Sequence, residues 1–114
     1  MNIDFSKYDE TLVHSPRGGQ GTFGMRQYQT RDNRILKGRL LPGSAFGMHA
    51  HETNSEMMIF LSGQGKMVSP EGEERVSPGA VSHCPRGSSH CLVNDGEEDL
   101  VFIALIPEHG AENQ

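Results

Sequence analysis

Short apolar segments alternate along the chain with clusters of Gly, Pro, Asn and Asp, and no apolar pattern of helical period continues for three turns. This pattern is typical of β-strands joined by tight turns. The expected strands are residues 23–29, 35–41, 47–51, 56–61, 65–69, 74–76, 81–84, 90–94 and 100–106. Turns at 63–65, 70–72, 85–87 and 94–96 complete the rhythm of an all-β sandwich or closed barrel, in which closure hides the sheet edges.

The chain has 114 residues, enough for one hydrophobic core, and we expect a single domain over 1–114 because no internal repeat or linker interrupts it. The longest apolar run, 100–106, is far shorter than the roughly 20 residues of a membrane-spanning helix. The N-terminus also lacks the basic-then-apolar pattern of a signal peptide, so we expect a soluble, cytoplasmic protein. Cys84 and Cys91 are too few for a disulfide framework and are expected to be reduced, although a bridge between them is an alternative.

A formal net charge of −5 argues against binding to nucleic acid or to an anionic membrane, since both require clustered positive charge. Residues 1–40 nevertheless carry seven Lys or Arg against four acids, which indicates either solvated surface or an anion-attracting rim. The Gly-rich stretch 17–21 is interpreted as a flexible loop, with contact to substrate as the alternative. For Arg26, Lys37 and Arg39, surface ion pairs are favoured over a barrel-facing Arg that holds a carboxylate or phosphate.

Two histidines are spaced to share one face of a strand. His49 and His51 are separated by one residue, so on a strand their imidazoles point the same way and can hold one ion. Glu56 opens the next expected strand and can add a carboxylate oxygen, and His90 can add a fourth ligand if the fold brings its distant hairpin close. Three imidazoles and one carboxylate suit manganese, iron, nickel, copper or zinc. A single histidine is more often a surface or hydrogen-bonded residue than a metal ligand, so the prediction depends on the four residues together.

These residues also belong to two motifs that resemble those of the cupin superfamily. The first motif, spanning 43–63, is matched by Gly43, His49, His51, Glu56 and Gly63, and the second, spanning 79–94, by Gly79, Pro85, Gly87, His90 and Asn94. The resemblance implies a double-stranded β-helix, or jelly-roll barrel. It also implies that His49, His51, Glu56 and His90 are the ligands of one divalent transition metal.

The strand alternation predicts which side chains surround the ligands. Met58 and Phe60 share the face of Glu56, and Leu92 shares that of His90, so these three either line a substrate pocket or fill the barrel interior. The residues that face the other way on the strand of Glu56 are Met57, Ile59 and Leu61. An outward apolar row suggests burial against another layer or subunit and, since cupins commonly form dimers, we expect a homodimer.

The resemblance leaves the reaction open. We expect a metal-dependent enzyme acting on a small polar metabolite such as a sugar, carboxylate or flavonol, by isomerase, lyase, decarboxylase or dioxygenase chemistry. The alternatives are a non-catalytic barrel that binds or senses a small molecule, and a metal that serves stability alone. His83, next to the expected Pro85 turn, is a weak candidate for proton transfer or for support of the metal pocket.

Overall fold

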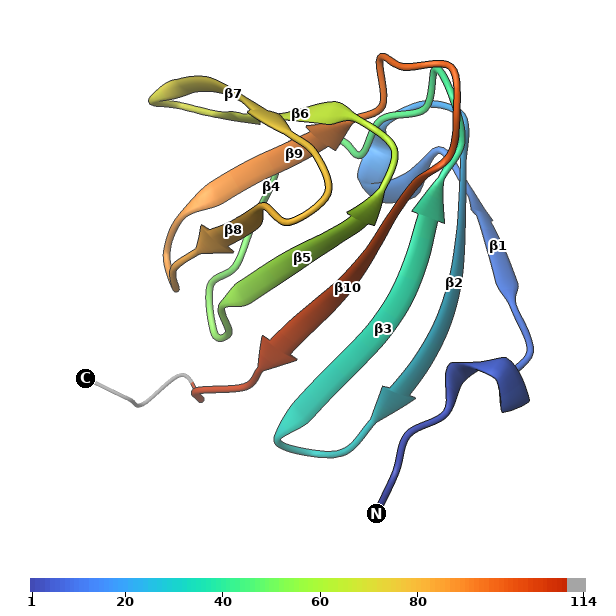
Figure 1. Cartoon of the computed structure of the whole chain (residues 1–114). Coiled ribbons are helices and arrows are strands. Elements are labelled where there is room, and N and C mark those ends of the chain that lie inside the picture. The colour runs from blue at the N-terminus through green and yellow to red at the C-terminus, as the bar shows by residue number, and fades with distance from the viewer. Residues whose placement is uncertain (111–114) are drawn as a thin grey trace.

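Two antiparallel β-sheets face each other in the computed structural model, which describes residues 1–110 (Figure 1). The larger sheet has six strands in the order β1-β2-β3-β10-β5-β8, and the smaller has four in the order β4-β9-β6-β7. The strand bounds are β1 Thr11–His14, β2 Thr22–Gln29, β3 Asn33–Leu40, β4 His49–Ala50, β5 Glu56–Ser62, β6 Gly65–Ser69, β7 Gly72–Val76, β8 Val81–Cys84, β9 Ser89–Val93 and β10 Leu100–Pro107. Two short 3-10 helices, η1 (Phe5–Lys7) and η2 (Pro16–Gly18), lie in the N-terminal part. The predicted all-β, jelly-roll double-stranded β-helix is confirmed.

The core lies between the sheets and follows from the alternation of each strand. Along β10 the burial changes at every residue, so Leu100, Phe102, Ala104 and Ile106 face inward. Phe102 stacks on Phe23 of β2 with ring centroids 5.8 Å apart, and apolar burial of this kind is the main stabilising term of a small domain. Among residues 1–110 no helix is long and apolar enough to cross a bilayer.

A buried amide joins the ends of several strands. The Asn94 side chain is fully buried and donates to the backbone oxygens of Leu40 and Glu98, both at 2.8 Å. Its Oδ1 accepts a hydrogen bond from the backbone N–H of Gly96 at 2.9 Å. Buried polar groups are tolerated where they are hydrogen-bonded in this way, so Asn94 ties the segment after β9 to β3.

The structure differs from the sequence prediction in three segments. Strand β1 was not expected, because Val13 is the one residue of this edge strand that is partly buried and the apolar pattern is weak. The expected strand 47–51 is reduced to β4, since single hydrogen bonds on either side, from Phe46 N to Leu92 O and from His51 N to Ser88 O, replace regular pairing. The Gly-rich stretch includes part of η2, and its Gln20 exchanges two backbone hydrogen bonds with Ala45.

Candidate metal centre

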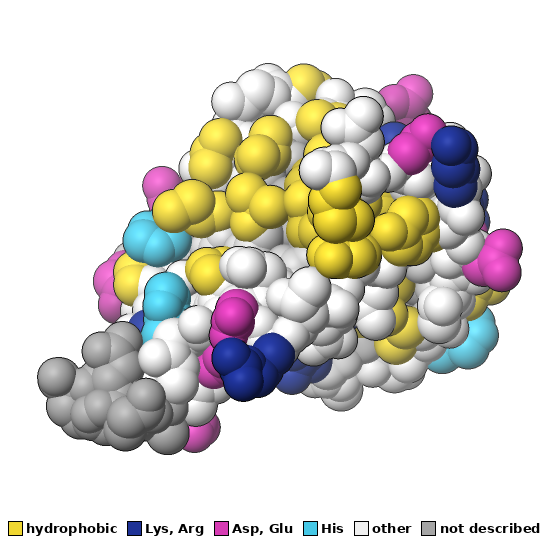
Figure 2. All heavy atoms as spheres, turned by 90° about the horizontal axis from the view of Figure 1, so that it is seen from below, with side chains coloured by type: hydrophobic (Ala, Val, Ile, Leu, Met, Phe, Trp, Pro, Cys, Tyr) yellow, Lys and Arg dark blue, Asp and Glu magenta, His cyan; other side chains and the backbone are white. Residues whose placement is uncertain are grey.

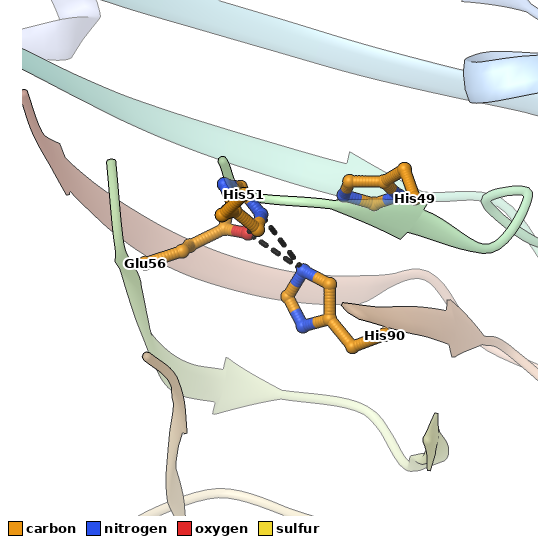
Figure 3. Close-up of side chains that lie close together, drawn as sticks. All are labelled: His49, His51, Glu56 and His90. Carbon is orange, nitrogen blue, oxygen red and sulfur yellow. Dashed lines mark hydrogen bonds and ion pairs between the residues drawn. The ribbon is translucent and has the colours of Figure 1, made fainter. Parts of the chain in front are cut away.

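Both sheets contribute to one cluster of three histidines and a glutamate (Figure 3). His49 of β4 lies directly opposite His90 of β9 in the smaller sheet, and His51 follows immediately after β4. Glu56, the first residue of β5, reaches the same point from the larger sheet. The fold therefore brings together all four predicted ligands.

The donor atoms of the cluster lie close together. His51 Nε2 and His90 Nε2 are 3.1 Å apart, and each lies near Glu56 Oε1, at 3.0 Å and 2.9 Å. With the nitrogen of His49, all four donor atoms lie within 4.8 Å of one another. His51, Glu56 and His90 are buried and His49 is half-buried, so water competes little for these atoms.

Two hydrogen bonds orient the imidazoles. His49 Nδ1 lies 2.8 Å from the carbonyl oxygen of Gly47, and His51 Nδ1 lies 2.6 Å from Oδ1 of Asn54. A carbonyl oxygen can only accept, so Nδ1 carries a proton in both rings, and the Nε2 atom of each ring offers a lone pair whenever that ring is neutral. Carbonyl oxygens that accept from the remote nitrogen commonly fix the tautomer of metal-binding histidines.

The surroundings also set the charge of the ligands. Burial opposes ionisation of Glu56, but hydrogen bonds from His51 and His90 outweigh it and lower the pKa of this carboxyl to about 2. Burial lowers the pKa of His49, and the neighbouring histidines and Arg17 add to this effect, so the ring is neutral near pH 7. The hydrogen bond to Glu56 raises the pKa of His51 against the effect of burial.

This donor set fits a single divalent transition-metal ion. Two atoms that each lie about 2.1 Å from an ion, in adjacent positions of an octahedron, are roughly 3.0 Å apart. The separations of 2.9–3.1 Å among His51, Glu56 and His90 match that spacing. Three nitrogen donors and one carboxylate are also a chemical set that manganese, iron, nickel, copper and zinc accept, so the cluster can hold such an ion.

A cavity of about 60 Å³ adjoins the cluster. Its apolar wall comes from both sheets and consists of Phe23, Leu36, Phe46, Met58, Leu92, Phe102 and Ile106. Met58 and Leu92 therefore lie where the sequence places them. Phe60 does not line the cavity: it is 1% exposed and packs against Phe102 deeper in the core, which corrects its assignment to the pocket.

The weaker candidates lie elsewhere. His83 is opposite Met57 on the outer face of the larger sheet, where it is exposed and does not line the cavity. The structure therefore does not place His83 beside the metal pocket, as the sequence analysis had suggested. Cys84 is buried opposite Glu56, and burial and that carboxylate raise the pKa of its thiol, which disfavours the nucleophilic thiolate. Cys84 and Cys91 are free thiols.

Sequence reasoning missed Asn54 and Arg34 next to the cluster, whereas Arg17 belongs to the stretch 17–21, for which contact to substrate was the alternative. Asn54 orients His51, and the side chains of Arg17 and Arg34 belong to the cavity wall. Arg34 was overlooked because the expected strand began one residue later, at 35. The alternation of buried Leu36 and Leu40 on β3, continued back by one step, would have placed Arg34 on the inner face.

The outward-facing cationic residues behave differently. Arg39 forms ion pairs with Glu10 at 2.7 Å and Asp99 at 3.1 Å, as expected for a surface residue. It therefore does not supply a cation to the barrel interior.

Comparison with known proteins relates the chain to one family. Residues 37–106 match the family model described as "Cupin domain". An "oxalate-binding protein" of Thermotoga maritima is 31% identical over 112 residues, which cover 93% of each chain. A "glucose-6-phosphate isomerase" of Pyrococcus horikoshii is 39% identical over 64 residues, 52% of this chain but 34% of that enzyme.

Solved structures agree with this relationship. A "predicted oxalate decarboxylase" from Thermotoga maritima superimposes with a TM-score of 0.88 and 28% identity, over 95% of this chain and 99% of the other. The "polyketide cyclase RemF" from Streptomyces resistomycificus shares the fold, with a TM-score of 0.77 and 21% identity over 94% of this chain and 78% of its own. With the matching profile, the paired motifs and the double-stranded β-helix, the chain belongs to the cupin domain family.

Proposed function

We propose that the chain binds one divalent transition-metal ion through His49, His51, Glu56 and His90 and captures a small carboxylate at that ion. The convergence of four donor atoms on a cavity of about 60 Å³ carries this proposal. Four protein ligands leave two positions of a six-coordinate ion for oxygen atoms of a ligand. The name of the oxalate-binding relative, which matches over nearly the whole chain, makes oxalate the first molecule to test.

The acidic content of the cavity wall favours reversible binding over turnover. Among the described residues that line it, Glu56 is the one carboxylate, and His51 and His90 hold it as an anion. Decarboxylation of oxalate would break the C–C bond, release CO₂ and require one proton for the carbon that becomes formate. Among the described residues that line the cavity, no second carboxylic acid is present to donate that proton. Turnover is the second candidate because one similar structure is described as a predicted oxalate decarboxylase.

The test combines metal content with ligand binding. Protein purified without chelator or nickel resin should contain about one transition metal per chain by elemental analysis, and His49→Ala should lose it. His83→Ala, which removes an exposed imidazole away from the cavity, should retain it. Calorimetric titration of the manganese-loaded chain with oxalate should show binding that the metal-free chain lacks.

The outcomes separate the candidates. Release of formate and CO₂ by the loaded protein would favour the enzyme, and stable binding without products would favour capture. Absence of metal from both the unchanged chain and His83→Ala, together with no uptake of added manganese, would refute the metal-dependent proposal.

We also propose that the outer face of the larger sheet pairs with a second copy of the chain. Met57, Leu61 and Val81 on this face are 44%, 42% and 61% exposed, and Figure 2 shows hydrophobic side chains gathered on the underside of the molecule. Contiguous exposed apolar surface commonly marks an interface. Analytical ultracentrifugation should show a dimer that Met57→Lys dissociates and Met48→Lys, at an exposed position before β4, does not.

A further inference from the structure

Arg34 brings a cation to the inner face of the larger sheet. It precedes buried Leu36 and Leu40 on the same face of β3 and is half-buried beside the metal cluster. Its Nε donates to Oε1 of Gln27 at 2.7 Å, and Nη2 contacts the sulfur of Met25 at 3.6 Å. A guanidinium has five N–H groups, so these two contacts orient Arg34 and leave donors for a ligand.

Arg17 approaches the same cavity from a loop that is held in place. The backbone N–H of Gly47 donates to Pro16 O at 3.0 Å, and Gln20 exchanges two backbone hydrogen bonds with Ala45, each at 2.9 Å. Arg17 itself has φ 54°, a left-handed conformation that costs energy for a residue with a side chain. A Cβ on Gly47 would collide with Arg17 O, so glycine is needed where this loop touches the segment leading to His49.

Within residues 1–110 neither arginine forms an ion pair with an acidic side chain at 4.0 Å or less. The ion pairs of that part of the chain use Arg31, Arg39, Lys66 and Arg75, together with the two imidazole contacts to Glu56. Burial lowers the pKa of Arg34 and the positive charge of Arg17 lowers it further, while the negative charge of Glu56 partly opposes both effects. Two neighbouring guanidinium groups that form no ion pair with a carboxylate keep donors available for binding an anion.

The two arginines also mark the way out of the metal pocket. A second, polar cavity of about 110 Å³ shares Arg17, Arg34, His51 and Ile106 with the metal cavity. Its other walls are formed by Gln29, Thr30, Arg31, Asn33, Asn54 and Glu108. A ligand bound at the metal ion therefore has the arginines on the side that leads toward this polar space.

From this arrangement we infer an anion subsite of Arg34 and Arg17, which selects dianionic ligands with one acid group at the metal ion and a second on the guanidinium pair. This inference rests on the proposed function and names the class of ligand more narrowly. A divalent ion and two guanidinium groups face the cavity against the single negative charge of Glu56, so a dianion leaves less uncompensated charge than a monoanion does. The small cavity favours short dicarboxylates.

Oxalate and oxamate provide a matched pair of probes. Oxamate replaces one carboxylate of oxalate by an amide, so it keeps the size and the metal-binding oxygens but loses one negative charge. We expect the manganese-loaded chain to bind oxalate about tenfold or more tightly than oxamate, because a charge-assisted hydrogen bond is roughly twice as strong as a neutral one.

Calorimetric titration of manganese-loaded variants tests the subsite. Arg34→Gln and Arg17→Gln should each lower oxalate affinity by roughly 10- to 100-fold and reduce the preference over oxamate toward one, with manganese content unchanged. Lys37→Gln is the control, since it removes an equal charge from an exposed side chain on the outer face of β3 that lines neither the metal cavity nor the second, polar cavity. The manganese content and melting temperature of each variant exclude loss of folding as the cause.

The outcomes distinguish this inference from the proposal beneath it. If the unchanged chain binds no metal, or binds metal and no oxalate, the proposed function fails and the subsite with it. If it binds both but the preference for oxalate survives in Arg34→Gln and Arg17→Gln, the subsite alone is refuted. An equal loss in Lys37→Gln also refutes the subsite, because it would indicate attraction by overall charge.

Discussion

Asn54 should control metal affinity although it does not itself reach the metal site. Its Oδ1 accepts the Nδ1 proton of His51 at 2.6 Å and so presents Nε2 toward Glu56 and His90. Asn54→Ala removes this acceptor, which allows the ring to rotate or to move its proton to Nε2. Either change places a proton or a carbon where a lone pair is required.

The size of the effect follows from the hydrogen bond that is lost. A neutral hydrogen bond contributes about 1 kcal/mol net, which corresponds to roughly fivefold in affinity. Loss of such an outer partner typically costs 10- to 100-fold in metal affinity, or about 1.4–2.7 kcal/mol, because the ligand also becomes disordered. The short distance and the burial of His51 place Asn54→Ala in this higher range.

A competition titration against a fluorescent zinc or manganese chelator measures this change directly. Asn54→Asp keeps an acceptor oxygen and should retain affinity, and Asn33→Ala removes an exposed amide of the same type as a control. Circular dichroism of the metal-free proteins checks that each variant folds. If the metal affinity of Asn54→Ala lies within twofold of that of the unchanged chain, the hydrogen bond to Nδ1 of His51 is not needed for metal binding and the reasoning is refuted.

The remaining predictions concern stability, pH and the Arg17 loop. Asn94→Ala breaks the three hydrogen bonds of a fully buried side chain and should lower the free energy of unfolding by about 2–4 kcal/mol in urea denaturation of metal-free protein. A change below about 0.5 kcal/mol would contradict this role. The pKa of His51 is raised above 6.5, so its pairing with Glu56 stabilises the metal-free fold below pH 6.5 and is lost as pH rises through the folded-state value. Denaturation of metal-free protein should therefore show this contribution to stability decline above pH 6.5. Manganese affinity should rise over the same pH range, because His51 releases the proton that competes with the metal. A manganese affinity independent of pH in this range would argue against His51 as a ligand. Gly19→Ala should displace the loop of Arg17, because its Cβ would meet Ala45 O, and calorimetry should then show weaker oxalate binding at unchanged manganese content; unchanged oxalate affinity would show that the loop position is unimportant.

The alternation and the turns were sufficient to predict the all-β fold and most strand positions. Each inward residue of β10 is apolar, and Gly and Pro interrupt the chain where the strands end, so both signals are local and can be read from neighbouring residues. The one-residue separation of His49 and His51 likewise determined that both could face one ion. Edge strand β1 was missed because three of its four residues are exposed and leave little apolar pattern. The strand predicted over 47–51 was too long, because regular pairing there is limited to His49–Ala50.

Tertiary structure decided everything that depends on contacts between distant segments. The pairing of β4 with β9 brings His90 to His49, and the packing of the two sheets brings Glu56 to the same point. Phe60 and Met58 share a strand face and were indistinguishable by alternation, yet Phe60 is buried against Phe102 whereas Met58 reaches the cavity. Strand period determines the side of a sheet on which a residue lies, whereas the depth of that residue and its partners depend on how the two sheets pack.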